Sequence, residues 1–147
     1  MTTKTMIGAA VAASAFFAAP LAADVPPFVD SVVSQMTSII AERATAGWDF
    51  RQGAMGHIDR GRSIEHDLRT DWMKTTEVRA WCDADCSDVD LEVYTSNGEL
   101  AATDLATDDH PVVTFEPQPG IRYRARVIMA ACAQDPCYYS MAAFTPR

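Results

Sequence analysis

The stretch W-C-D-A-D-C-S-D-V-D-L-E-V-Y, residues 81–94, decides the fold. Its second half, residues 89–94, alternates apolar with polar residues, which is the pattern of a half-buried β-strand. The Asn97-Gly98 pair that follows favours a tight hairpin, because both residues tolerate positive φ. The stretch therefore predicts a hairpin within an antiparallel β domain.

Other runs of the chain alternate in the same way and are separated by turn signals, which indicates a mainly β protein built as an antiparallel β-sandwich. Residues 63–69 and 73–81 predict two antiparallel strands joined by a short turn. In the second of these runs the alternation sends Val78 and Ala80 inward and Trp81 outward. The remaining predicted strands are residues 99–103, 112–116, 121–129 and 138–144.

Apolar residues recur at helical spacing before this β region and predict one amphipathic helix over residues 28–46, with Gly47 placed to end it. We expect the helix to pack on its own sandwich. Glycines at 53, 56 and 61 predict a connecting loop over residues 47–62. The predicted organisation is a signal peptide over residues 1–23, the helix and its connecting loop over 24–60, and a β-sandwich domain over 61–147.

The first residues have the order of a secretory leader. Lys4 supplies a positive start, residues 6–17 are apolar, and the small residues of Pro20-Leu21-Ala22-Ala23 precede Asp24. We expect cleavage before Asp24 and a periplasmic or secreted protein, with no membrane insertion after cleavage.

Four cysteines in an exported chain indicate disulfide bonds before metal ligands. They allow three pairings. The short spacings favour local bonds, Cys82 with Cys86 and Cys132 with Cys137. A crossed bond such as Cys82 with Cys137 would instead tie the two cysteine loops together.

Acidic residues dominate the middle of the chain. The formal net charge is −8, and residues 82–121 contain ten Asp and Glu but no Lys or Arg. Such a field repels nucleic acid and attracts cations or basic proteins. Because of this repulsion we expect no nucleic-acid partner. An alternative interpretation is that the charge serves only to keep a secreted protein soluble.

Aspartates recur in two turns of this acidic span. Carboxylate oxygens are hard donors, and Ca²⁺ takes six to eight oxygen ligands, so we expect calcium as the one candidate cofactor. The alternative is that these side chains bond the backbone of their own turns. The candidate metal ligands are Asp83, Asp85, Asp88, Asp90, Asp104, Asp108 and Asp109.

Two further features suggest a partner-binding surface. Trp81 is predicted to face outward, where a tryptophan can anchor a protein or stack on a glycan. Arg122, Arg124 and Arg126 share one face of a predicted strand. They either bind a partner or pair with acids on neighbouring strands, among which Asp90 and Glu92 are candidates.

The order S-I-E-H-D-L-R, E-V-R-A-W, D-V-D-L-E-V-Y, G-I-R-Y-R-A-R-V and Y-Y-S-M-A-A-F, over residues 61–144, resembles the bacterial pre-peptidase C-terminal domain family and its stand-alone secreted relatives. The resemblance implies a jelly-roll-like sandwich, a non-catalytic accessory role and, in some members, calcium bound by loop acids. No peptidase accompanies the domain in this chain. The two cysteine pairs and the N-terminal helix also go beyond the family's minimal pattern.

The sequence carries none of the short motifs of hydrolases, zinc proteases or nucleotide-binding proteins. We therefore expect a non-catalytic binding or accessory module with a protein or glycan partner. Two alternatives are a small secreted hydrolase with an unrecognised site and an acidic inhibitor or chaperone-like partner of a basic protein.

Overall fold

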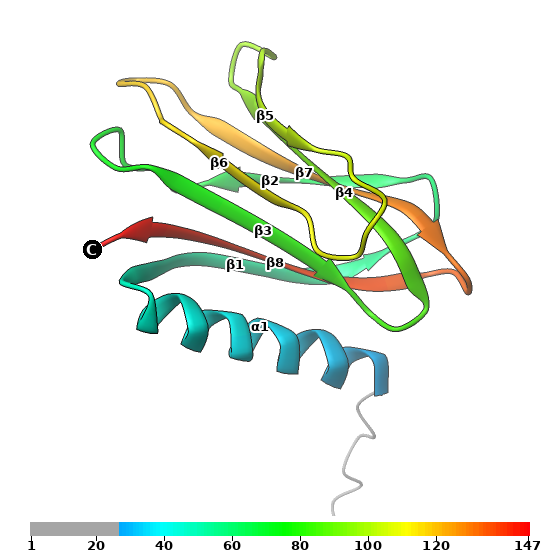
Figure 1. Cartoon of the computed structure of the whole chain (residues 1–147). Helices are drawn as coiled ribbons and strands as arrows, with labels where there is room; N and C mark the ends of the chain where they lie inside the picture. Colours follow the sequence, from blue (N-terminus) through cyan, green and yellow to red (C-terminus); the bar gives the residue numbers. More distant parts are fainter. Residues whose placement is uncertain (1–26) are drawn as a thin grey trace, which may run out of the picture.

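The computed structural model describes residues 27–147, in which one helix precedes eight strands (Figure 1). The predicted leader lies outside the described residues. The predicted helix and the mainly β architecture are confirmed. The elements are α1 (Pro27–Thr45), β1 (Trp48–Ile58), β2 (Ser63–Leu68), β3 (Thr76–Cys82), β4 (Cys86–Thr95), β5 (Leu100–Asp104), β6 (Val112–Phe115), β7 (Tyr123–Cys132) and β8 (Cys137–Pro146).

The strands form two four-stranded sheets that pack face to face. Sheet A has the order β1-β8-β3-β6 and sheet B the order β2-β7-β4-β5, and the paired strands are antiparallel. This is the strand order of an eight-stranded jelly roll. Val78 and Met141 from sheet A meet Leu91 and Val127 from sheet B in a core from which water is excluded. The sandwich prediction is therefore confirmed.

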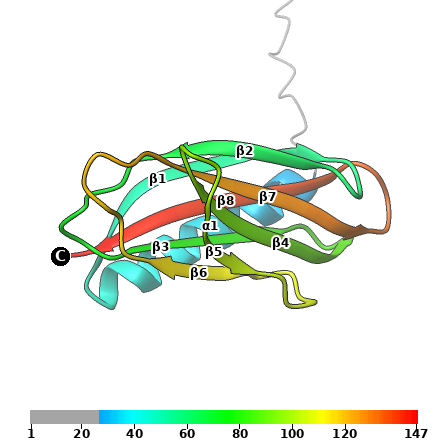
Figure 2. The ribbon, with the colours of Figure 1, turned by 90° about the horizontal axis from the view of Figure 1, so that it is seen from above.

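Helix α1 covers the outer face of sheet A and leaves the outer face of sheet B open (Figures 1 and 2). Gly47, with φ at 85°, turns the chain from the helix into β1, a backbone conformation that glycine adopts at low cost. The ring of Phe28 stacks on Tyr138, and the Ser140 hydroxyl donates to the carbonyl of Val32 at 3.2 Å. The expectation that the helix packs on its own domain is confirmed.

The connecting loop predicted over residues 47–62 is wrong, because residues 48–58 form β1, an edge strand that pairs with β8. The glycines that suggested a loop are places of close approach instead. A side-chain carbon at Gly53 would meet the Phe50 ring at 3.1 Å and the Met36 sulfur at 3.3 Å. A carbon at Gly56 would meet the Tyr139 ring at 3.1 Å.

The predicted hairpin between residues 63–69 and 73–81 is also wrong. Both strands exist, but β2 lies in sheet B and β3 in sheet A, so the chain crosses between the sheets. The hairpin predicted at Asn97-Gly98 is confirmed: β4 pairs with β5, and Gly98 has φ at 84°.

Both disulfide bonds are local, Cys82 with Cys86 and Cys132 with Cys137, as the spacing favoured. They lie side by side, because Cys86 and Cys132 are register partners of β4 and β7. Disulfides are typical of proteins that fold in an oxidising compartment. Across residues 27–147 the structure contains no helix long and apolar enough to cross a membrane.

Candidate functional site

An acidic cluster lies where β4 meets the loop between β5 and β6. The main-chain N–H of Val89 donates to the carbonyl of Asp108 at 3.0 Å, which fixes this loop against β4. Burial raises the pKa of Asp90, and the negative charges of its neighbours raise it further. The acidic cluster consists of Asp90 and those four neighbours, Asp88, Glu92, Asp104 and Asp108.

The members of the acidic cluster differ in what they do for the fold. Asp104 accepts hydrogen bonds from the N–H groups of Ala106 and Val112 at 3.2 and 2.8 Å, and Asp108 accepts one from the N–H of His110 at 2.8 Å. These bonds hold the loop in shape, as aspartates in turns commonly do. Asp88 has a buried carboxylate oxygen with no hydrogen-bond partner among the described residues.

Three of the seven predicted metal ligands are not members of the acidic cluster: Asp83, Asp85 and Asp109. Asp83 is almost fully buried, and its carboxylate accepts the N–H of Tyr138 at 2.9 Å, extending the pairing of β3 with β8. Burial raises the pKa of Asp83. The carbonyl of Asp85 accepts the N–H of Ala133 at 2.7 Å. Asp109 pairs with the imidazole of His110.

The seven aspartates therefore do not form one coordination shell. Within the described part of the chain, no three or more His, Cys, Asp or Glu side chains are arranged to hold a metal ion. Calcium binding stays a prediction from the sequence. The chemistry that the acidic cluster offers is a concentrated negative charge.

The outer face of sheet B carries the predicted arginine row, and the neighbouring strands supply acids for part of it. Arg124 donates to Glu65 at 2.7 Å, and Arg126 donates to the same carboxylate at 2.8 Å. Arg126 also lies 3.5 Å from Glu92. The pairing predicted with Glu92 is confirmed, whereas Asp90 forms no ion pair with the arginines of the described chain.

Sequence reasoning missed Glu65, the acid that holds two arginines. The hydrogen bond from Arg126 lowers the pKa of Glu65. The guanidinium of Arg126 also lies 4.7 Å from the centre of the Tyr94 ring. The signal was present, since Glu65 alternates with inward residues in S-I-E-H-D-L-R, but only the observed pairing of β2 with β7 identifies its partners.

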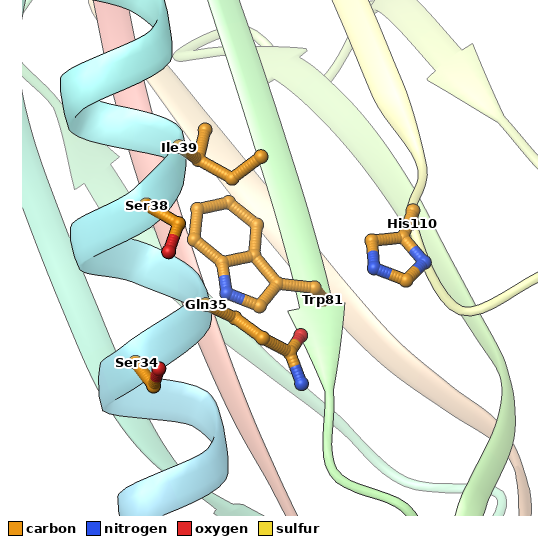
Figure 3. A pocket seen from close by; sticks show the side chains of 6 residues that line it. All are labelled: Ser34, Gln35, Ser38, Ile39, Trp81 and His110. Carbon is orange, nitrogen blue, oxygen red and sulfur yellow. The ribbon is translucent and has the colours of Figure 1, made fainter.

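Trp81 lies on the outward face of β3, as the alternation predicts, but it is not a surface anchor. Helix α1 covers it, and only 1% of the residue is exposed. The indole lies against the helix beside Ser38 and Ile39 (Figure 3). Its N–H has no hydrogen-bond partner in the described chain, and neither does the buried Oε1 of Gln35.

A groove of about 210 Å³ opens above this indole, between α1 and the loop that carries His110 (Figure 3). Its lining is mixed in polarity and contains no Asp, Glu, Lys or Arg: Ser34, Gln35, Ser38, Ile39, Trp81 and His110.

The fold and these surfaces define a small, disulfide-containing β-sandwich protein with one strongly acidic end. No protein-family model matches the chain, and no curated protein matches it.

Proposed function

We propose that this chain is an extracytoplasmic, non-catalytic binding module whose acidic cluster binds a positively charged segment of a protein partner. The observation that carries the proposal is the placement of four carboxylates around a fifth, that of Asp90, whose pKa is raised first by burial and then by repulsion from these four. Of these five, only Glu92 forms an ion pair within the described residues. A cationic segment of a partner relieves this repulsion.

Three further observations support a secreted accessory role. The two disulfides and the leader-like N-terminus agree with export. The resemblance to the pre-peptidase C-terminal domain family implies an accessory module. His66 lends no support to the hydrolase alternative, because it faces inward and its Nε2 lies 2.7 Å from the buried hydroxyl of Tyr139.

Neutralising two members of the acidic cluster tests the proposal. Within residues 27–147 the side chains of Asp88 and Asp90 form no hydrogen bond that shapes the loop, so D88N/D90N removes charge at little structural cost. We expect this variant to bind a fluorescent lysine- and arginine-rich peptide about tenfold more weakly than the parent, because each exposed charge contact contributes up to about 1 kcal/mol. Fluorescence anisotropy at 50 mM salt measures the affinity.

The matched control is D59N/E99Q, which removes the same charge from turns at Asp59 and Glu99 outside the cluster. Its affinity is expected to stay within about twofold of the parent, and the parent's affinity to fall as salt rises, since ions screen exposed charges. Equal affinity of D88N/D90N and the parent would refute the proposed site. Calcium at constant ionic strength displaces the peptide only if the predicted ion site forms.

The stability of the fold should depend on the ionisation of Asp90. Because folding raises the pKa of this carboxyl, the ionised form opposes folding at neutral pH. The destabilisation by ionised Asp90 disappears as pH falls below the ordinary aspartate pKa of about 3.9, because the carboxyl is then protonated in both the folded and the unfolded protein. We therefore expect D90N to stabilise the protein by up to about 1 kcal/mol at pH 7 and to lose this advantage near pH 3.

Urea denaturation of the parent and D90N across this pH range measures the difference in free energy of unfolding. D59N is the control, since that exposed aspartate lies in the turn between β1 and β2. If D90N were less stable than the parent at pH 7, the ionised Asp90 carboxylate would make a favourable interaction in the folded protein, and the expected destabilisation by its charge would be refuted.

A further inference from the structure

A second polar hollow lies at the opposite end of β4 from the acidic cluster. Its volume is about 250 Å³. Ser96 lies in the β4–β5 hairpin. Its main-chain N–H donates to the carbonyl of Arg122 at 2.7 Å, and this hydrogen bond fixes the hairpin beside the hollow. The lining residues are Asp67, Ser96, Arg122 and Arg124, from β2, the hairpin, the turn before β7 and β7 itself.

The charges of this hollow are not paired with one another. Asp67 and Arg124 are direct register partners on neighbouring strands, yet Arg124 reaches diagonally to Glu65. The carboxylate of Asp67 and the guanidinium of Arg122 have no ion-pair partner within residues 27–147. Glu65 compensates Arg124, so the hollow presents one free cation and one free anion.

Because the hollow contains both an unpaired cation and an unpaired anion, it disfavours a ligand that carries only one sign of charge. A simple anion attracted to Arg122 meets the carboxylate of Asp67, and a simple cation attracted to Asp67 meets two guanidiniums. A ligand with an ammonium group and a carboxylate a few bonds apart satisfies both sides. A guanidinium binds carboxylate oxygens through two parallel N–H donors, and the Ser96 hydroxyl can add another donor.

We propose that this hollow binds a small zwitterion of the α-amino acid type. Arg122, with Arg124 beside it, receives the carboxylate, and Asp67 receives the ammonium group. The site is distinct from the acidic cluster, so it does not rest on the function proposed above.

Three probes that share the alanine side chain and differ in which charged groups they carry test the proposal. L-alanine carries both charges, N-acetyl-L-alanine only the carboxylate, and L-alaninamide only the ammonium group. We expect L-alanine to cause saturable shifts of the amide signals of residues 66–68, 95–97 and 121–125 in ¹H–¹⁵N spectra of the folded, oxidised full-length chain. Each singly charged probe should bind about three- to fivefold more weakly, the effect of one exposed ion pair.

Variants complete the test. R122Q and D67N should each weaken L-alanine binding about three- to fivefold, whereas R51Q and D59N, which change the same charges elsewhere on the surface, should leave it unchanged. Near-parental spectra away from the hollow establish that each variant is folded. Equal affinities for L-alanine and N-acetyl-L-alanine would reduce the hollow to a simple anion site, and the absence of saturable shifts would overturn the proposal.

Discussion

Replacing Trp81 with alanine is expected to lower the free energy of unfolding by about 3–5 kcal/mol, the usual cost of removing a buried tryptophan. The indole is fully enclosed between sheet A and α1. It forms a small apolar cluster with Ala142 and Phe144 of sheet A. The helix and the start of β1 complete this cluster through Met36, Ile39, Ile40 and Trp48. Alanine would leave a cavity at the centre of the contact that holds the helix on the sandwich.

Trp72 provides a matched control, because it is 58% exposed. We expect W72A to change stability by no more than about 0.5 kcal/mol, as surface substitutions commonly do. Urea denaturation followed by far-ultraviolet circular dichroism measures both variants. If W81A and W72A had the same stability, α1 would not be packed on sheet A in solution.

The indole N–H offers a finer comparison at the same position. It has no hydrogen-bond partner in the described chain, so W81F should lose ring volume without breaking a hydrogen bond. Its destabilisation is therefore expected to be well below that of W81A. Similar losses for the two variants would indicate a bond to the indole nitrogen in solution.

The alternating strands were predictable from the sequence because one side of each faces the core and the other faces water. β4 and β7 are of this kind, and their residue order matches their burial. β3 and β8 are different, since sheet A is covered on both faces. Alternation places Trp81 on the correct side of β3, but it cannot reveal that a helix far away in the chain lies over that side.

The candidate sites depend on strand neighbours, which alternation does not specify. The sequence identified the row of arginines, yet β2 was expected to pair with β3 instead of β7. Glu65 therefore had no predicted role, and the hollow around Asp67 and Arg122 was not foreseen. The acidic span was evident from composition, but only the loop contact at Val89 selects which of its acids lie together.

Replacing Glu77 with glutamine is the second change for which we expect a large effect, a loss of about 3 kcal/mol. The Glu77 side chain is 8% exposed. One carboxylate oxygen accepts from Arg43 of α1 at 3.0 Å, and the other from Arg79 at 2.7 Å. Glutamine keeps the shape of the side chain but leaves the guanidiniums of Arg43 and Arg79 without their anion. Removing one partner of a buried ion pair costs about 3–5 kcal/mol.

An exposed ion pair of the same chain serves as the control. Asp49 lies 3.0 Å from Arg147, with side chains 49% and 60% exposed, so D49N should cost less than about 1 kcal/mol. The double variant R43Q/E77Q removes one cation together with the anion and should recover part of the loss of E77Q. Urea denaturation of the parent, R43Q, E77Q and R43Q/E77Q gives the coupling energy of the pair. A coupling near zero would mean that Arg43 does not fasten α1 to sheet A, and the attachment of the helix would then rest on the apolar cluster around Trp81.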